Sequence, residues 1–313
     1  MNAPRGTRVF FPDEMEQRRF VKNTLRGVVE SYGYREIATP TFEFFDLFAL
    51  KSGEEIEEQM YIFTDKKGRK LALRPEMTAP VMRAASSIIK SEPKPIRLYY
   101  FANNFRYERP QAGRYREFFQ FGVESIGGDD DAMDAEIIRL SVDMLKSVGL
   151  EDFVVRVNNI SEGSMKLLQD VEMVFDGHLQ RGLDYYTGMV FEIDVPSLGA
   201  QKQVCGGGSY SLPQILHDDV STRGFAIGFD RLMLTVPLEK DRRWSLRKKI
   251  CVAAMKKEYY PQAMGIANRQ REWGDRVALI IKNRNGAIKY AKHYDFDECI
   301  GIDGSGEVVL WKK

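Results

Sequence analysis

Cysteine is scarce in this chain, and the cysteines that it has lie far apart. Cys205, Cys251 and Cys299 are the three among 313 residues. An odd number of widely separated thiols argues against a disulfide framework and lacks the short spacings of a zinc site. We therefore expect reduced thiols in a cytoplasmic protein. No apolar run is long enough to span a bilayer, so we expect no membrane partner. The N-terminus has an acidic turn where a signal peptide needs an apolar core, so we expect no export signal.

Net charge is almost absent at +1, but this value hides two opposite regions. Residues 241–313 carry 16 lysines and arginines against 9 acidic residues, whereas residues 1–240 carry 30 against 36. A basic tail behind a mildly acidic body indicates a polyanion as the partner of the tail. A solvated lysine-rich surface is the simpler alternative. The hydrophobic share of 43% and the charged share of 29% are typical of a soluble globular protein, and the length allows a large domain and a small one.

The most informative stretch is residues 105–124, FRYERPQAGRYREFFQFGVE. Apolar and charged residues alternate on both sides of a turn that contains Pro110 and Gly113, which predicts two antiparallel strands joined by a long loop. Arginine suits phosphate because its planar fork binds two oxygens and keeps its charge, and phenylalanine offers a flat face to a base. An exposed hairpin tied by cross-strand ion pairs is the alternative. We expect these side chains to project from the hairpin: Arg106, Glu108, Arg114, Gln120 and Glu124.

This stretch resembles motif 2 of the class II aminoacyl-tRNA synthetases, in the form that histidyl-tRNA synthetases use. The likeness rests on the order Arg-x-Glu-Arg-Pro, Gly-Arg-Tyr-Arg and Gln-x-x-x-Glu. A predicted helix, Gly33 and a strand that closes at Pro40 resemble motif 1, which forms the dimer interface in the family. Other blocks follow in the family's order: PRGTR at 4–8, RPEMT at 74–78, RGLDYYTG at 181–188, CGGGSY at 205–210 and GFAIGFDRL at 224–232, which resembles motif 3.

The chain departs from the family's pattern at several places. Val9 and Asp230 stand where the family usually has Asp and Glu, and Ser209 and Ser211 follow the triple glycine where charged residues are usual. The largest departure is the short segment 160–175, because the family usually carries a sizeable helical insertion there that reaches towards the tRNA acceptor arm. We expect that domain to be missing or reduced to one helix at 162–168.

The resemblance implies an α+β fold, with an antiparallel class II sheet of six or seven strands flanked by helices, followed by a small C-terminal α/β domain. We expect the histidyl-tRNA synthetase-like catalytic domain at residues 1–240 and a shortened anticodon-binding-like domain at 247–313, joined by a basic linker at 242–249. Helical periodicity predicts helices from residue 12 or 13 to 32 and at 131–149. In the tail, predicted strands at 250–255, 276–281, 298–302 and 307–311 alternate with helices at 259–273 and 286–293.

A two-step reaction is implied by the same resemblance. The histidine carboxylate attacks ATP to give histidyl-adenylate and pyrophosphate, and the terminal ribose hydroxyl of tRNA(His) then takes the histidyl group. Positive charge must surround the phosphate, because a negative nucleophile approaches a negative centre. Arg106 and Arg181 are therefore the catalytic candidates. Phe118 would stack on adenine and Glu108 would accept from its amino group. The expected ATP-binding residues are Arg106, Glu108, Arg114, Phe118 and Arg231.

The resemblance also implies a pocket for histidine. Glu124 and Tyr186 would read the two imidazole nitrogens, while Glu76, Thr78 and Gln120 would face the ammonium group, with Tyr185 and Arg181 completing the set. A carboxylate and a hydroxyl can both accept from an ammonium group, although Glu76 and Thr78 would serve equally as a helix N-cap. Adjacent tyrosines point to opposite faces of an extended chain, so one can enter the pocket while the other packs. Magnesium is implied by phosphoryl chemistry, but no ligands for it are predicted.

A histidine–tRNA ligase that uses ATP, binds histidine and tRNA(His) and forms a homodimer is the leading interpretation. A paralogue that serves as a histidine-binding regulatory subunit of ATP phosphoribosyltransferase is the chief alternative, favoured by the lost insertion and the altered glycine motif. A paralogue that passes an activated amino acid to a non-tRNA acceptor is a third. Two features favour the enzyme. One is a basic C-terminal domain, which such regulatory subunits typically lack, and the other is the set of four arginines, Arg106, Arg114, Arg181 and Arg231.

Overall fold

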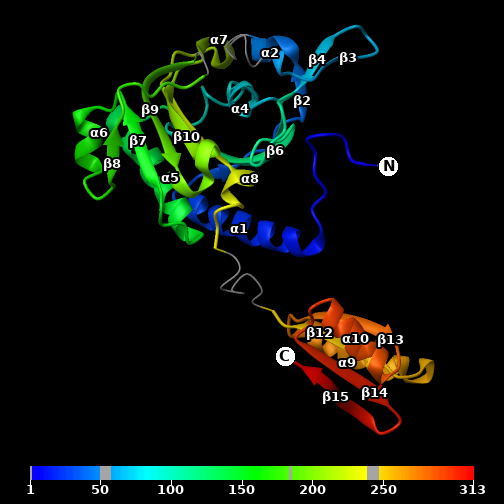
Figure 1. Ribbon diagram of the computed structural model, residues 1–313. Helices are drawn as coiled ribbons and strands as arrows, with labels where there is room; N and C mark the ends of the chain where they lie inside the picture. The colour runs from blue at the N-terminus through cyan, green and yellow to red at the C-terminus, as the bar shows by residue number, and fades with distance from the viewer. Residues whose placement is uncertain (1, 50–57, 183–184, 238–246) are drawn as a thin grey trace. The chain divides into compact units, whose positions relative to one another are not determined.

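The computed structural model describes residues 2–49, 58–182, 185–237 and 247–313. Its internal contacts divide the chain into two compact units, Met1–Leu238 and Glu239–Lys313 (Figure 1). Most of the basic linker expected at 242–249 lies outside the described residues. No helix in the described ranges is both long and apolar enough to cross a membrane.

An eight-stranded sheet forms the centre of the first unit. Six of its strands pair antiparallel in the order β5-β6-β11-β10-β9-β7, and a parallel strand is added at each edge, β1 beside β5 and β8 beside β7. The antiparallel part has six strands, within the six or seven expected, and the two short parallel edge strands bring the whole sheet to eight. The bounds are β1 Arg35–Glu36, β5 Ile96–Phe105, β6 Glu117–Ile126, β7 Val154–Asn158, β8 Met173–Phe175, β9 Tyr186–Asp194, β10 Gln203–Tyr210 and β11 Thr222–Gly228.

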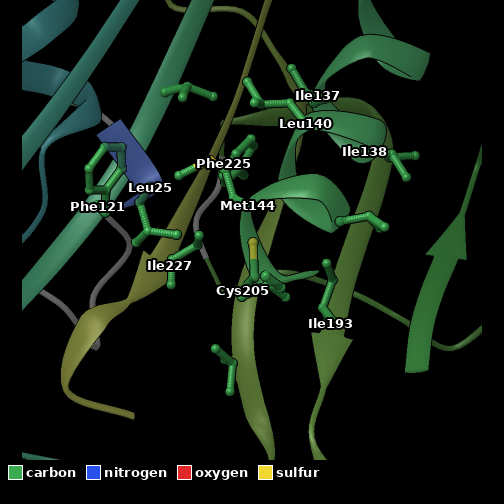
Figure 2. Packing of buried hydrophobic residues seen from close by; sticks show 14 of the residues in the cluster. Leu25, Phe121, Ile137, Ile138, Leu140, Met144, Ile193, Cys205, Phe225 and Ile227 are labelled. Carbon is green, nitrogen blue, oxygen red and sulfur yellow. The ribbon is translucent and has the colours of Figure 1, made fainter. Parts of the chain in front are cut away.

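Two long helices, α1 (Pro12–Ser31) and α5 (Asp130–Ser147), pack against each other and cover one face of this sheet (Figure 1). Proline suits the first turn of α1, where its missing N–H has no helical partner, and the predicted apolar face is fully buried at Val21, Leu25 and Val29. Figure 2 shows the resulting core, in which side chains from α5 meet Phe225 and Ile227 from β11. The period of two along each strand leaves the alternate residues for the opposite face.

The opposite face carries a smaller layer. Strands β2 (Phe42–Phe44), β4 (Lys70–Leu73) and β3 (Ile62–Thr64) form a separate antiparallel sheet, and β3 and β4 form a hairpin. Helices α2 (Phe45–Ala49), α4 (Thr78–Ala85) and α7 (Pro213–Leu216) contribute to a second core, which includes Tyr100 and Tyr210 from the large sheet. The remaining elements of this unit are α6 (Glu162–Leu167), the 3₁₀ helix Pro196–Gln201 and α8 (Phe229–Leu232).

The second unit is a four-stranded sheet in the order β13-β12-β14-β15, with β15 antiparallel to its neighbour. Helix α9 packs on one face through Ala263 and Ile266, and α10 packs on the other through Ala287 and Ala291. This alternation of strands and helices confirms the predicted order of elements in the tail. The bounds are β12 Lys249–Ala254, the 3₁₀ helix Lys257–Tyr259, α9 Tyr260–Glu272, β13 Arg276–Ile281, α10 Arg284–His293, β14 Glu298–Asp303 and β15 Gly306–Lys312.

Candidate active site

Two neighbouring cavities lie on the face of the large sheet that α1 and α5 leave open. The larger has a volume of about 720 Å³ and the smaller about 430 Å³. Three polar residues, Arg106, Gln120 and Arg181, line both of them. The larger cavity is lined by charged and aromatic residues that include Arg106, Glu108, Arg114, Phe118, Arg181, Asp230 and Arg231. The smaller is lined by polar residues and tyrosines that include Glu76, Thr78, Tyr100, Glu124, Tyr185, Tyr186 and Tyr210.

The hairpin β5–β6 brings the motif 2 residues to these cavities. Phe105 pairs with Glu117 at the loop end of the hairpin, and reciprocal backbone hydrogen bonds between Gln111 and Arg114 close the turn within the loop 106–116. Gly113 takes a φ of 76° in this turn, a conformation that glycine adopts without strain. The N-terminal segment fastens the loop, since the Arg116 N–H donates to the Gly6 carbonyl at 2.8 Å. The predicted hairpin is thus confirmed, with its arginines in the loop rather than on the strands.

Backbone carbonyls and a nearby carboxylate hold the arginines of the larger cavity. Arg231 donates to the carbonyls of Gly113 at 3.0 Å and Gln203 at 2.8 Å. Arg106 donates to the Pro75 carbonyl at 2.9 Å. Arg114 is more exposed and pairs with Glu108. Burial lowers the pKa of Arg106 and of Arg231, yet both stay charged because arginine loses its proton only at very high pH. The structure therefore brings four predicted arginines to one cavity, Arg106, Arg114, Arg181 and Arg231.

Arg181 stands at the boundary between the two cavities, just before β9. Its Nη1 donates to Glu192 at 2.9 Å, and its guanidinium lies 5.7 Å from the centre of the Tyr186 ring. Burial alone would lower the pKa of Arg181, but Tyr186 and Glu192 outweigh it and raise the value. A Cβ added to Gly206 would lie 1.9 Å from Nη1, so the guanidinium occupies the space that the missing side chain leaves. The space that the triple glycine leaves beside the backbone is therefore filled, in part, by the protein's own arginine.

Glu124 closes the smaller cavity from β6. It is 1% exposed and accepts hydrogen bonds from the hydroxyls of Thr78, at 2.9 Å, and Tyr210. Burial raises the pKa of Glu124 to about 8, with a further contribution from the Glu76 carboxylate, while the two hydroxyl donors lower it. A Cβ on Gly224 of β11 would lie 2.0 Å from Oε2, which explains the small residue at this position in motif 3. The carboxyl group is therefore poised to titrate near neutral pH.

The tyrosines of the smaller cavity correct one prediction. Tyr185 and Tyr186 were expected on opposite faces, but both line the cavity, with ring centres 5.0 Å apart. The reason is local: β9 begins only at Tyr186, so Tyr185 lies in a turn where strand alternation does not apply. Leu183 and Asp184, in the same motif, lie outside the described residues.

Glu76, Thr78 and Gln120 also lie at the cavity, each with a partner within the protein. Glu76 accepts from the backbone N–H groups of Thr78, at 2.5 Å, and Ala79, at 3.0 Å, so it caps α4. The capping role considered from the sequence is therefore present, and the same carboxylate lines the cavity. Gln120 accepts from Asn104 at 2.5 Å. Burial raises the pKa of Glu76.

Several residues at the site were not selected from the sequence. Tyr210 lies in the recognised CGGGSY block, and its hydroxyl contacts Glu124. Ser209 next to it points the other way and donates to Asp134 of α5 at 2.6 Å, so the change to serine falls on the buried face of the sheet. Asp230 accepts from Arg18 at 2.9 Å and from the Phe119 N–H at 2.7 Å, which ties α1 and β6 to the start of α8. Side chains alternate between the two faces of a strand, so the sequence of β10 could have shown that Ser209 and Tyr210 point to opposite faces.

Taken together, an antiparallel sheet with an arginine-lined cavity beside a polar one is the arrangement that the resemblance predicted for a class II aminoacyl-tRNA synthetase. The chain belongs to the histidyl-tRNA synthetase family, because the profile described as "Histidyl-tRNA synthetase" matches residues 6–161 and 156–232. The two matched pieces meet where the sequence places the missing insertion.

Individual relatives agree with the family match. The chain is 41% identical to the "Histidine--tRNA ligase" of Archaeoglobus fulgidus, over 91% of this chain and 87% of that protein. That alignment has 360 positions, more than the chain has residues, so the relative carries segments that this chain lacks. The apo histidyl-tRNA synthetase of S. aureus superposes with a TM-score of 0.82 at 31% identity, over 96% of this chain and 90% of that one.

A further solved structure is similar in fold. It is titled as an ATP phosphoribosyltransferase regulatory subunit/histidyl-tRNA synthetase from Bacillus halodurans, and it superposes with a TM-score of 0.79 over 96% of this chain and 97% of that one. Its identity to this chain is 23%, so this likeness concerns the fold alone.

Proposed function

We propose that the chain is a histidine–tRNA ligase. It activates histidine with ATP, giving histidyl-adenylate and pyrophosphate, and then transfers the histidyl group to the terminal ribose hydroxyl of tRNA(His). The observation that carries this proposal is the convergence of four arginines on one cavity that shares a wall with a second cavity closed by Glu124. Such a pair of sites can hold a polyphosphate and a small polar amino acid side by side.

The arginines supply fixed positive charge for the first step. The histidine carboxylate attacks the α-phosphorus, and the bond from that phosphorus to the bridging oxygen of pyrophosphate breaks. Arg106 and Arg181 line both cavities, so we assign them to the α-phosphate and to the attacking carboxylate. Arg114 and Arg231, which line only the larger of these two cavities, would hold the outer phosphates. Charge held in place before the reaction stabilises the transition state without the cost of reorganising solvent.

The adenine ring would lie on Phe118, whose ring centre is 5.5 Å from the Arg106 guanidinium carbon. This distance is too short for a base to lie between the two groups, so the base would stack on the face of the Phe118 ring that Arg106 leaves free. Arg114 contacts Oε2 of Glu108, and we assign Oε1 to the adenine amino group. Glu108 would thus read the base and hold a phosphate-binding arginine at once.

Histidine would enter the smaller cavity with its ring towards Glu124 and Tyr186 and its ammonium group towards Glu76, Thr78 and Gln120. Tyr185 would pack against the ring. The pocket is buried and polar, so a side chain that lacks the two ring nitrogens could not make the hydrogen bonds to Glu124 and Tyr186. This penalty gives selectivity for histidine over an apolar residue of similar size.

Magnesium is implied by the triphosphate chemistry. In the described ranges no group of three or more His, Cys, Asp or Glu side chains is arranged to hold a metal ion. Magnesium takes few protein ligands in many nucleotide sites and keeps phosphate and water oxygens.

Transfer to tRNA would use the second unit, Glu239–Lys313, which we propose is a shortened anticodon-binding-like domain. Its basic composition suits a phosphate backbone. We also propose a cytoplasmic homodimer, as motif 1 implies. Binding of tRNA(His) should weaken steeply between about 50 and 200 mM salt, because phosphate contacts release counterions. Affinity that stays constant across this range, measured by fluorescence anisotropy, would argue against the tail as a phosphate contact.

Isotopic exchange between pyrophosphate and ATP tests the first step directly. We expect exchange that requires histidine and is not supported by phenylalanine or glutamine. A charging assay with tRNA(His) then tests the second step. Binding of histidine without exchange would instead favour the regulatory-subunit alternative, and exchange without charging would favour a non-tRNA acceptor.

A further inference from the structure

Glu192 on β9 lies behind Arg181 and lines neither of the two cavities described above. Its Oε1 accepts from Arg181 Nη1 at 2.9 Å and from Gln203 Nε2 at 2.9 Å. Its Oε2 accepts from Arg156 Nη2 at 2.8 Å. Both carboxylate oxygens therefore accept hydrogen bonds from side chains of the protein, and one of those side chains is Arg181, which lines both cavities.

The Arg181 side chain requires a fixed hydrogen-bond partner because the residue lies in an irregular segment of the backbone. It belongs to no helix or strand, so its backbone is not fixed by a ladder of hydrogen bonds. Its guanidinium instead lies against Gly206 of β10 and is fastened to β9 through Glu192. A flexible side chain on an irregular segment must lose rotamer freedom on taking up one position, and a charged hydrogen bond to a rigid strand compensates for that loss.

Glu192 is itself held by Arg156 of β7. The Arg156 guanidinium donates to three carboxylates at 2.8 Å each, those of Glu192, Asp176 and Asp194. Because Arg156 is engaged on three sides, Glu192 cannot swing far towards the cavity without breaking this arrangement. The anchor is therefore rigid, and it leaves the other face of the Arg181 guanidinium directed to the cavities.

We propose that Glu192 is a positioning residue that fixes the Arg181 guanidinium at the junction of the two cavities. This inference rests on the proposed function, since that junction is where the histidine carboxylate would meet the α-phosphate. Glu192 touches neither substrate and acts only through Arg181. Its removal should therefore slow adenylate formation more than it weakens the binding of histidine or ATP.

A double-mutant cycle in the pyrophosphate exchange assay tests the proposal with the full-length protein. Glu192→Gln keeps the size of the side chain but gives one oxygen in place of two. We expect it to lower kcat about 10- to 100-fold, the factor that corresponds to one charged hydrogen bond, while KM for either substrate changes by less than about threefold. In an Arg181→Ala background, Glu192→Gln should lower kcat by less than about twofold, because Glu192 acts only through the Arg181 side chain that is then absent. Equal losses in both backgrounds, or no loss in the parent, would overturn the proposal.

Asp176→Asn is the matched control. It removes a carboxylate from Arg156 and makes no direct change at Arg181, so kcat should stay within about threefold of the parent. A loss as large as that of Glu192→Gln would mean that the whole cluster matters only for folding, and the proposal would fail.

A second measurement does not depend on activity. Side-chain ¹H–¹⁵N spectra, with Arg181→Lys used for assignment, should show slowly rotating Nη groups of Arg181 in the parent and in Asp176→Asn. These signals should be averaged by fast rotation in Glu192→Gln. Unchanged signals in Glu192→Gln would overturn the positioning role, even if the parent shows no histidine-dependent exchange and the proposed function itself has failed.

Discussion

The two cavities share a wall but hold polar groups of different kinds. The larger presents guanidinium groups whose charge does not change at any physiological pH. The smaller presents a buried carboxyl group and phenol hydroxyls, and the pKa of its Glu124 is raised to about 8 by burial. Permanent positive charge therefore dominates the larger cavity, and the smaller adds groups that can gain or lose a proton.

This difference matches the ligands that we propose for the two cavities. A triphosphate is anionic throughout the physiological range, so fixed cations suit it without any need for titration. An imidazole ring changes charge near pH 6.5, so its partner must tolerate either state. The predictions below test this division, starting with the largest expected effect.

Replacing Arg181 with alanine should slow adenylate formation about 100- to 1000-fold, the range found when one preorganised donor to a developing charge is removed. Affinity for histidine should change by less than about tenfold, because the ring-binding groups remain. Single-turnover rates and calorimetric titration would separate the two. Arg114→Ala is the control at the exposed end of the same cavity and should mainly raise KM for ATP. Unchanged turnover in Arg181→Ala would show that the fixed positive charge of Arg181 does not contribute to adenylate formation.

Replacing Glu124 with glutamine should weaken histidine binding about 10- to 100-fold at pH 7, through loss of a charged hydrogen bond. Between pH 6.5 and about 8 the free imidazole is neutral and the Glu124 carboxyl group is protonated. The complex needs one proton between these two groups, and in this pH window Glu124 already carries it. Below this window the imidazolium must lose a proton, and above it the complex must gain one. Affinity should therefore peak in the window.

The pH profile of that variant sharpens the comparison. Glutamine does not titrate, so Glu124→Gln should lose the alkaline decline and keep the acidic one, which comes from the substrate. Titration calorimetry from pH 5.5 to 9.5 measures both limbs. If the alkaline decline persists in the variant, a group other than Glu124 causes it. The titrating carboxyl group would then no longer distinguish the smaller cavity from the larger one.

Replacing Phe118 with alanine should raise KM for ATP about five- to tenfold, in keeping with the loss of one stacked aromatic face. Phe118→Tyr keeps the face and should stay within about twofold. Neither variant should alter the pH profile of histidine binding. A larger effect on histidine than on ATP would show that the two cavities do not divide the substrates as proposed.

Much of the fold could be predicted from sequence periodicity and the order of the motifs. Val21, Leu25 and Val29 define the buried face of α1 by their spacing alone, and the hairpin around Gly113 follows from alternation and turn residues. The short strands could not be predicted in this way. Strand β8 has three residues, too few for a period of two to stand out, and it depends on pairing with β7.

At the site, the sequence identified residue types better than their contacts. Glu124 is recognisable from its motif, but its hydroxyl partners, Thr78 and Tyr210, lie 46 and 86 residues away along the chain. Tyr185 was given strand geometry although the strand begins one residue later. Glu192 was not selected because its role depends on Arg181, which lies in an irregular segment whose path no local pattern predicts. Long-range pairing and irregular backbone are the features that single-sequence reasoning does not reach.

The shared wall has a consequence for how the substrates assemble. Arg106 and Arg181 each face both cavities, so whichever ligand arrives first restrains the same two side chains for the second. The entropy of that restraint is then lost once rather than twice, and by thermodynamic linkage each ligand must tighten the other by the same factor.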